Sequence, residues 1–325
     1  MARLSRREFL ALAGAGALTA AAAACAPRAG GVQDTPAPVT SSPLPGVLVT
    51  DGGFEMIRVE GGSFERGSMG GHEDEQFIHT VTLTRPYYIA THAVTFEQYE
   101  EFCRDVDKPR PDVGSWGRGN HPVCGLNWYD AVEYCNWLSA KDGLTACYDV
   151  DVLRQLWSPS ASPGSQVMEA PCYHAVPKNG YRLPTEAEWE FAARGAHKSQ
   201  GYVYAGSDDA DEVGWYADNS DGHPHPIGER APNELGLYDM SGNVCEFCWD
   251  LYAWNYYYFS SLPENEVMRI DPMGFGALAH MNRVLRGGNF LSELDDLRTA
   301  ARVYGVPLAH GVYGFRLALT LGESG

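Results

Sequence analysis

Glycine and proline recur along this chain, and they limit the folds open to it more than any other feature. The sequence holds 36 glycines and 20 prolines among 325 residues. Both residue types interrupt helices and mark turns. The chain is therefore predicted to form many turns and long irregular connections, which excludes a helical bundle.

Local patterns predict a few regular elements between these turns. Each predicted helix begins at a capping residue that precedes an apolar stripe. The predicted elements, in chain order, are strands at 80–84 and 87–89 and helices that begin after Thr95, Asn127 and Thr185, the last two ending at Gly143 and Gly195. Strands and helices do not alternate as βαβ units, so we expect the α+β class.

The N-terminus has the pattern of an export signal. Arg6 and Arg7 lie in the twin-arginine sequence Ser-Arg-Arg-Glu-Phe-Leu, and 11–24 is an uncharged, alanine-rich run too short to span a bilayer. We interpret 1–24 as a twin-arginine lipoprotein signal peptide. An N-terminal helix of a cytosolic protein is the alternative.

Cys25 follows three alanines, as in a lipoprotein cleavage site. Two or three acyl chains on this residue would give a stable anchor, whereas plain cleavage would release the protein. Ala26, in place of aspartate, favours the outer membrane. We expect an exported protein, lipid-anchored to the outer membrane or cell surface, with a location on the periplasmic side as an alternative. The membrane would be contacted only through the anchor.

Composition divides the rest of the chain into a tether and one domain. Residues 25–52 are rich in Pro, Ser, Thr and Gly and lack apolar periodicity, so we predict a flexible tether there and a folded domain over 53–322. The formal net charge of −18 disfavours contact with phosphate backbones, and we expect no nucleic-acid partner.

Seven cysteines remain besides Cys25, an odd number for an oxidising compartment. Cys147 and Cys172 flank a stretch that has the character of an insertion, and they are the disulfide candidate. Cys245 and Cys248 form a single CxxC, which we interpret as two semi-buried thiols or a local disulfide.

Four ordered motifs carry a family resemblance. They are Tyr-Arg-Leu-Pro-Thr-Glu-Ala-Glu-Trp-Glu at 181–190, Pro-Asn-Glu-Leu-Gly-Leu-Tyr-Asp-Met-Ser-Gly-Asn-Val at 232–244, Arg-Gly-Gly-Asn-Phe at 286–290 and Gly-Phe-Arg at 314–316. Their order and spacing resemble the formylglycine-generating enzyme (sulfatase-modifying factor) domain. The resemblance implies a C-type-lectin-like fold with a small twisted sheet, two or three helices and extensive loops.

Residue chemistry adds local expectations within these motifs. Glu186 and Glu188 are predicted to cap a helix and to pair with Arg182 or Arg194. The glycines at 287–288 permit positive φ or a close backbone approach. The motif at 314–316 is predicted to form a core strand with a buried ring and a paired arginine.

The acidic turn at 239–246 is the best candidate for a metal site. Calcium prefers several oxygen ligands, and two carboxylates bracket a turn here. The resemblance implies calcium held by the side chains of Asp239 and Glu246 and the carbonyls of Gly242 and Val244; an acidic turn satisfied by arginine or water is the alternative. A second family calcium site would fall on Asn219 and the loop near Gly228, where an expected aspartate is absent.

The copper chemistry of the family is not supported by this sequence. Family members that make formylglycine hold copper(I) with two cysteines shortly after the Arg-Gly-Gly motif. Here the first of these positions is Ser292, and no cysteine occurs after Cys248. A soft ion needs soft thiolate ligands, so we expect no copper.

Two functions from different classes remain. The first is a displayed binding protein, because lipoproteins with this fold resemble the variable proteins of diversity-generating retroelements, in which C-terminal codons are randomised. Residues 285–316 contain no Lys, Gln, Met or Trp. We expect an unidentified protein or glycan ligand at a hypervariable C-terminal face formed by Ser292, Leu294, Tyr304, His310 and Tyr313. The alternative is an exported oxidase or maturation enzyme with a non-copper active site.

Replacing Cys25 tests the predicted anchor. Cys25→Ser is expected to move the protein from the membrane fraction to the soluble fraction, because the lipid attachment is lost. Cell fractionation and immunoblotting measure the shift, with Ser42→Ala in the same tether as the control. Equal membrane retention of the two variants would contradict the lipid anchor.

Overall fold

A five-stranded sheet forms the centre of the computed structural model, which describes residues 46–113, 116, 118–156, 179–274 and 282–320. Neighbouring strands in this sheet are antiparallel. In spatial order they are β1 (Val47–Val49), β2 (Glu55–Val59), β5 (Tyr87–Ala90), β13 (Ala318–Leu319) and β6 (Tyr181–Arg182). The last strand of the chain therefore lies inside the sheet, between two strands from much earlier positions.

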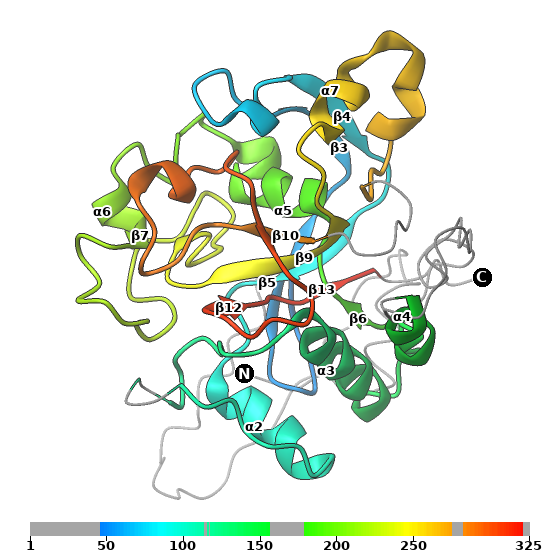
Figure 1. Ribbon diagram of the computed structural model, residues 1–325, viewed down its shortest axis with the longest axis vertical. Helices are drawn as coiled ribbons and strands as arrows, with labels where there is room; N and C mark the ends of the chain where they lie inside the picture. Colours follow the sequence, from blue (N-terminus) through cyan, green and yellow to red (C-terminus); the bar gives the residue numbers. More distant parts are fainter. Residues whose placement is uncertain (1–45, 114–115, 117, 157–178, 275–281, 321–325) are drawn as a thin grey trace, which may run out of the picture.

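This sheet is buried on both faces. Along β5, Tyr88 and Ala90 pack into one apolar core, while Tyr87 and Ile89 pack into another. This alternation follows from the two-residue period of a strand. Figure 1 shows α2 (Phe96–Asp105) and α3 (Trp128–Lys141) together on one side of the sheet, with α5 (Glu186–Ala193) on the other.

A four-stranded sheet carries the C-terminal motifs. Its order is β11 (Val303–Gly305), β10 (Arg283–Arg286), β9 (Cys245–Leu251) and β12 (Tyr313–Gly314). β12 runs parallel to β9, and the other neighbours are antiparallel. The register between β9 and β10 shifts between Arg283 and Leu285.

Short elements complete the fold. Two ribbons pair β3 (Gly62–Arg66) with β4 (His79–Leu83) and β7 (Gly214–Trp215) with β8 (Ser241–Gly242). The remaining helices are α4 (Val150–Leu156), α6 (Ala210–Val213) and α7 (Tyr256–Ser261), with 3-10 turns η1 (Glu73–Glu75), η2 (Ala196–Lys198), η3 (Pro263–Arg269) and η4 (Leu294–Leu297). None of the helices in the described ranges combines the length and apolar character needed to cross a bilayer.

The three predicted helices are confirmed by their caps. The side chains of Thr95, Asn127 and Thr185 each accept a hydrogen bond from the third helical residue, and each forms a complete capping box. The resemblance implied two or three helices. Three helices of eight residues or more are present in the described chain, together with the three shorter ones.

Two boundaries differ from the sequence-based expectation. The tether was predicted to extend to residue 52, but β1 pairs with β2, so the fold begins no later than Val47. The predicted core strand at 314–316 is also wrong in part. Only Gly314 belongs to β12, while Phe315 and Arg316 lie between β12 and β13, buried as expected.

Candidate functional site

The segment that follows β10 begins with a glycine turn that only glycine accommodates well. Gly287 and Gly288 have φ values of 91° and 67°, a region that side-chain-bearing residues rarely adopt. A Cβ at Gly288 would lie 3.0 Å from the carbonyl oxygen of Asp296, and one at Gly287 would lie 3.2 Å from the ring of Trp189. The positive φ values and the close approaches confirm the prediction made from the paired glycines, and the turn leads the chain away from the buried β10.

Backbone hydrogen bonds hold the next residues in a fixed path. The amide of Phe290 donates to the carbonyl of Asn243 at 3.0 Å, and the hydroxyl of Ser220 donates to the carbonyl of Phe290 at 2.7 Å. The carbonyl of Ser292 accepts from the amide of Ala217 at 3.0 Å. Residues 289–292 are therefore tied to two distant loops.

Ser292 and Cys245 lie on either side of Asn289. The Asn289 amide nitrogen donates to Ser292 Oγ at 3.1 Å, and its side-chain Nδ2 donates to Cys245 Sγ at 3.2 Å. Burial raises the pKa of the Cys245 thiol to about 12, so the thiol stays protonated at neutral pH. A buried thiol and a hydroxyl therefore occupy this position of the fold, where a copper(I) site would need a second soft ligand.

The predicted recognition residues differ in exposure. Leu294, Tyr304 and His310 are exposed, whereas Ser292 and Tyr313 are half-buried. The half-burial of Ser292 and Tyr313 follows from the contact of Ser292 with Asn289 and from packing of the Tyr313 ring on Phe247, with centroids 5.5 Å apart. None of the five is buried, but they do not protrude equally.

Contacts bring the segments around three of these residues together, although the Tyr304 ring itself packs on Tyr252, with centroids 4.8 Å apart. The ring of Tyr313 lies against Gly305 and Gly311, which directly follow Tyr304 and His310 in the chain. Ser292 is connected to Tyr313 only indirectly. Asn289 contacts both Ser292 and Cys245, and Cys245 is paired with Tyr313 between β9 and β12. Leu294 lies in η4, and no described contact links it to the other four.

The segment around His310 is held by the start of α3. The amide of Trp128 donates to the carbonyl of Pro307 at 3.1 Å, and the amide of Gly125 donates to the carbonyl of Gly311 at 2.8 Å. Asn127 Nδ2 lies 3.3 Å from His310 Nε2. The exposed loop therefore rests on a rigid helix terminus.

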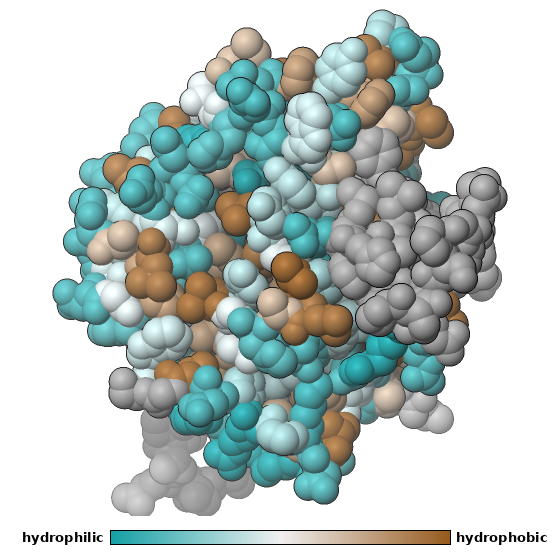
Figure 2. All heavy atoms as spheres, in the orientation of Figure 1, coloured by the Kyte–Doolittle hydropathy of each residue, from teal (hydrophilic) through white to brown (hydrophobic). Residues whose placement is uncertain are grey.

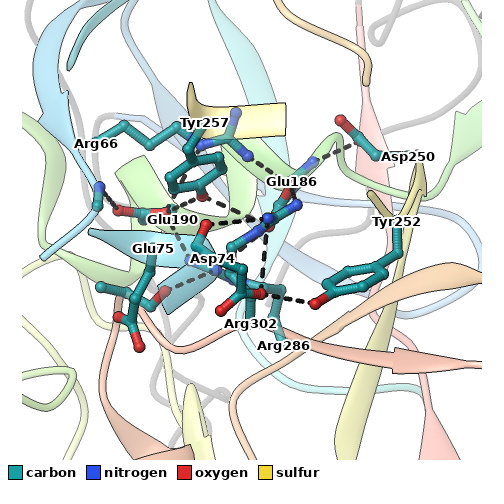
Figure 3. Close-up of polar contacts among 12 residues, drawn as sticks. Arg66, Asp74, Glu75, Glu186, Glu190, Asp250, Tyr252, Tyr257, Arg286 and Arg302 are labelled. Atoms are coloured by element: carbon teal, nitrogen blue, oxygen red, sulfur yellow. Dashed lines mark hydrogen bonds and ion pairs between the residues drawn. The ribbon is translucent and has the colours of Figure 1, made fainter. Parts of the chain in front are cut away.

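A buried ionic cluster lies beneath the C-terminal segment (Figure 3). Glu186 contacts Arg302 at 2.6 Å, Arg66 at 2.7 Å and Arg286 at 3.4 Å. Each of these four side chains is at most 1% exposed. Burial alone would raise the pKa of Glu186, but the three guanidinium groups lower it to about 2, so the carboxylate is ionised.

Glu190 extends this cluster by one helical turn. It contacts Arg286 at 2.7 Å and Arg194 at 2.9 Å, and it accepts a hydrogen bond from the Tyr257 hydroxyl at 3.1 Å. Burial opposes ionisation here too, yet the arginines lower the pKa of Glu190 to about 2. Through these pairs, α5 ties β3, β10 and the segment after η4 to one point.

The predicted partners of the helix-capping glutamates are confirmed for one residue and wrong for the other. Glu188 binds Arg182 through both oxygens, at 2.6 and 2.7 Å, as predicted. Glu186 points to the opposite side of α5 and pairs with neither Arg182 nor Arg194. The spacing of Glu186 and Glu190, four residues apart on one helical face, could have indicated a shared buried site.

The predicted disulfide involves a residue outside the described ranges. Cys172 lies there, and Cys147 is buried, with its thiol 3.3 Å from the carbonyl of Gly180. Cys245 and Cys248 are buried free thiols, which corresponds to the first of the two predicted alternatives.

The predicted calcium ligands are close in the fold but differ in their present partners. Asp239 is buried, its Oδ2 accepts from the amide of Gly228 at 2.9 Å, and its Oδ1 has no hydrogen-bond partner. Glu246 accepts two hydrogen bonds from Arg316 at 2.6 Å and one from Trp189 at 2.7 Å. The unpartnered buried oxygen of Asp239 fits a cation, whereas Glu246 is already neutralised by an arginine.

Asn219 has a structural role of its own. Its Oδ1 accepts from the amide of Tyr216 at 2.9 Å, and its Nδ2 donates to Asp211 at 2.9 Å and to the carbonyl of Gly214 at 3.1 Å. Within the described residues, no three His, Cys, Asp or Glu side chains come together in a metal-binding arrangement.

Comparison with known proteins places the chain in a family. The sulfatase-modifying factor enzyme 1-like domain matches residues 49–321. The chain belongs to this family. The formylglycine-generating enzyme of Streptomyces coelicolor is 30% identical over 305 residues, covering 81% of this chain and 88% of that protein.

Further relatives have other names. A protein called chaperone protein LppX from Paenibacillus barcinonensis is 35% identical over 216 residues, covering 61% of this chain and 72% of that protein. The solved structure of Treponema denticola variable protein 1 superposes with a TM-score of 0.63 at 30% identity, covering 82% of this chain and 95% of that one. Chlamydial serine/threonine-protein kinases named Pkn1 also match, and the chain spans 38% of their length. The family and its C-type-lectin-like fold are thus confirmed.

Neutralising Glu186 tests the ionic cluster. Glu186→Gln keeps the side-chain size but leaves buried arginines without a counter-charge, and it is expected to lower the free energy of unfolding by about 3–5 kcal/mol. Urea denaturation measures this change. Glu101→Gln, which removes an exposed pair with Lys141, is the control and should cost at most about 1 kcal/mol. A loss at Glu186 no larger than the control would contradict the cluster's role.

Asp250 gives a pH-dependent prediction. Its Oδ2 accepts from the amide of Glu186 at 2.7 Å, its Oδ1 has no partner, and burial followed by the charge of Glu186 raises its pKa to about 7. Since an unfolded aspartate has a pKa of about 3.9, the folded state binds an extra proton between these values, and this group makes stability fall as pH rises through them.

Asp250→Asn keeps the acceptor for the Glu186 amide and removes the titration. The variant should therefore gain stability relative to the wild type between roughly pH 4 and pH 7, by at most about 1.4 kcal/mol per pH unit. Urea denaturation of both proteins at several pH values measures the difference in stability. Burial lowers the pKa of His79 to about 4, which makes stability rise with pH, but this contribution is the same in both proteins and cancels in the difference. A difference that does not change with pH would contradict the raised pKa.

Proposed function

We propose that this domain binds a protein or glycan ligand through its C-terminal face, and that it is displayed as an exported lipoprotein. The face consists of Tyr304, His310 and Tyr313, with Ser292 at its edge and Leu294 in η4. The main support for this proposal is that the fold of the family is present beneath this segment, while a hydroxyl and a buried thiol lie beside Asn289. Tyrosine and histidine suit recognition, since they offer large contact area and hydrogen bonding at low entropic cost.

Two further observations support the binding proposal. The exposed side chains follow β10 and are held by the glycine turn, the amides of α3 and the ionic cluster, so their substitution would leave the core intact. The similarity to Treponema denticola variable protein 1 at 30% identity also favours a variable C-terminal face. The twin arginines and Cys25 support export and lipid attachment.

Replacing the exposed residues tests the face. Leu294→Ser, Tyr304→Ser and His310→Ser together are expected to abolish ligand binding and change the melting temperature little, because exposed substitutions usually cost less than about 0.5 kcal/mol each. Glycan-array and cell-surface binding of the purified protein measure recognition, and calorimetry measures melting. The control is Val106→Ser with Val203→Ser, two similarly exposed residues elsewhere.

Other outcomes would contradict the binding function. Unfolding of the triple variant would show that the face is structural. Conversion of a cysteine-containing sulfatase peptide to formylglycine by the wild-type protein would instead support the enzyme alternative.

We also propose that calcium binds at Asp239 with a structural role. Asp239 Oδ1 would be a ligand together with the carbonyls of Gly242 and Val244, and Glu246 would contribute a shared oxygen. The ion would offset the cost of the buried, unpartnered carboxylate. Calcium supplies charge compensation here and no redox chemistry.

Chelation tests the ion. Because an ion bound only by the folded state stabilises it by mass action, a chelator should lower the melting temperature and added calcium should restore it. Asp239→Asn should remove this dependence, with exposed Asp218→Asn as the control. A melting temperature indifferent to both chelator and calcium would support an acidic turn satisfied by Arg316.

A further inference from the structure

A second apolar surface surrounds α7, and its residues do not belong to the C-terminal face. We call it the α7 surface. Its side chains are between 36% and 80% exposed, although all six are aromatic or aliphatic: Phe77, Ile78, Tyr258, Phe259, Val267 and Ile270. Groups of exposed large apolar residues are uncommon on monomers and mark interaction sites.

Ring contacts join three of these residues directly, and packing between their elements places the others nearby. The rings of Phe77 and Tyr258 meet edge to face with centroids 5.2 Å apart, and Tyr258 meets Phe259 at 5.3 Å. Ile270 follows η3 and lies beside Thr82 of β4 through a backbone bridge. α7, η1, η3 and β4 pack on one another, and they form the upper part of the molecule in Figure 1. Figure 2 shows hydrophobic side chains on this part of the surface, among hydrophilic ones.

The base of this surface is rigid. Tyr256 and Tyr257, the first residues of α7, are buried, and the Tyr257 hydroxyl donates to Glu190 at 3.1 Å. The guanidinium of Arg66 lies 4.5 Å from the centre of the Tyr257 ring. The fold thus uses one side of α7 for its core and leaves Tyr258 and Phe259 outside it. A rigid platform that presents aromatic rings loses little entropy on binding.

Charge around the α7 surface indicates what binds there. Four exposed carboxylates border it, at Glu73, Glu264, Glu266 and Asp271, and the only basic residue of η3 is the partly buried Arg269. With a formal net charge of −18, a second copy of the chain or an anionic lipid surface would be repelled. A partner that presents an apolar side chain between lysines or arginines is complementary.

We propose that the α7 surface docks a protein partner through an aromatic or aliphatic side chain flanked by Lys or Arg. Phe77 and Tyr258 contact the apolar side chain, and Glu264 and Glu266 attract the basic residues. This site is independent of the ligand bound by the C-terminal face, so either proposal can fail without the other.

Selection from a random peptide library displayed on phage tests the partner's chemistry. Peptides are selected on the purified chain that carries Leu294→Ser, Tyr304→Ser and His310→Ser, which removes binders of the C-terminal face. We expect enriched sequences that combine an aromatic or aliphatic residue with Lys or Arg. Fluorescence anisotropy then measures the affinity of one synthetic enriched peptide for the variants.

The α7 variant is Phe77→Ser with Tyr258→Ser, and the matched control is Val106→Ser with Val203→Ser. The α7 variant should bind the peptide at least about tenfold more weakly, the effect of losing one or two central contacts, while the control binds normally. Glu264→Lys with Glu266→Lys should also weaken binding, and this pair keeps the proposal testable if the first variant does not fold.

Three results would overturn the proposal. The first is enrichment of peptides without basic residues, and the second is equal affinity for the α7 variant and the control. The third is an occupant of another kind: a dimer in sedimentation analysis, or binding to phosphatidylglycerol vesicles, that the α7 variant loses.

Discussion

The buried pairing of Glu186 and Glu190 with arginines is the interaction on which the rest of the structure depends. The two carboxylates lie on one face of α5, and their arginine partners come from β3, from the residue that directly follows α5, from β10 and from the segment after η4. Removing one partner from such a group leaves an uncompensated charge in the interior, which destabilises the fold far more than the loss of an exposed pair. This arrangement explains how a chain with so few regular elements holds long connections in fixed positions. It also fixes the base on which the surface segment after β10 lies.

The C-terminal segment combines this fixed base with altered chemistry. Asn289 connects Ser292 to Cys245, whose thiol stays protonated because it is buried. The family relationship therefore defines the scaffold, while the groups that lie beside Asn289 are a hydroxyl at Ser292 and a buried thiol at Cys245. Fold and activity are separable in this way because a site occupies few positions on a scaffold.

Much of the fold could be predicted because it depends on local signals. The caps at Thr95, Asn127 and Thr185 are each specified within four residues, and the paired glycines at 287–288 are required by their own φ angles. The partners of Glu186 could not be predicted, since Arg66 and Arg302 are more than a hundred residues away from it in the sequence. The half-burial of Tyr313 was missed for the same reason, because its ring packs on Phe247 of another strand. The family motifs indicated the fold, but they carried no information about the α7 surface, whose residues lie outside all four motifs.

The position of β13 has a consequence for biosynthesis. More than a hundred residues separate this strand from both β5 and β6 in the sequence, yet it lies between them in the five-stranded sheet. The sheet can therefore close only after β13 has been made, and folding must wait for pairings between segments that are far apart in the sequence, which are slow to form. A nascent chain of this kind would expose unpaired strand edges during translocation in an unfolded state. Completion of the fold before any transport step avoids this exposure.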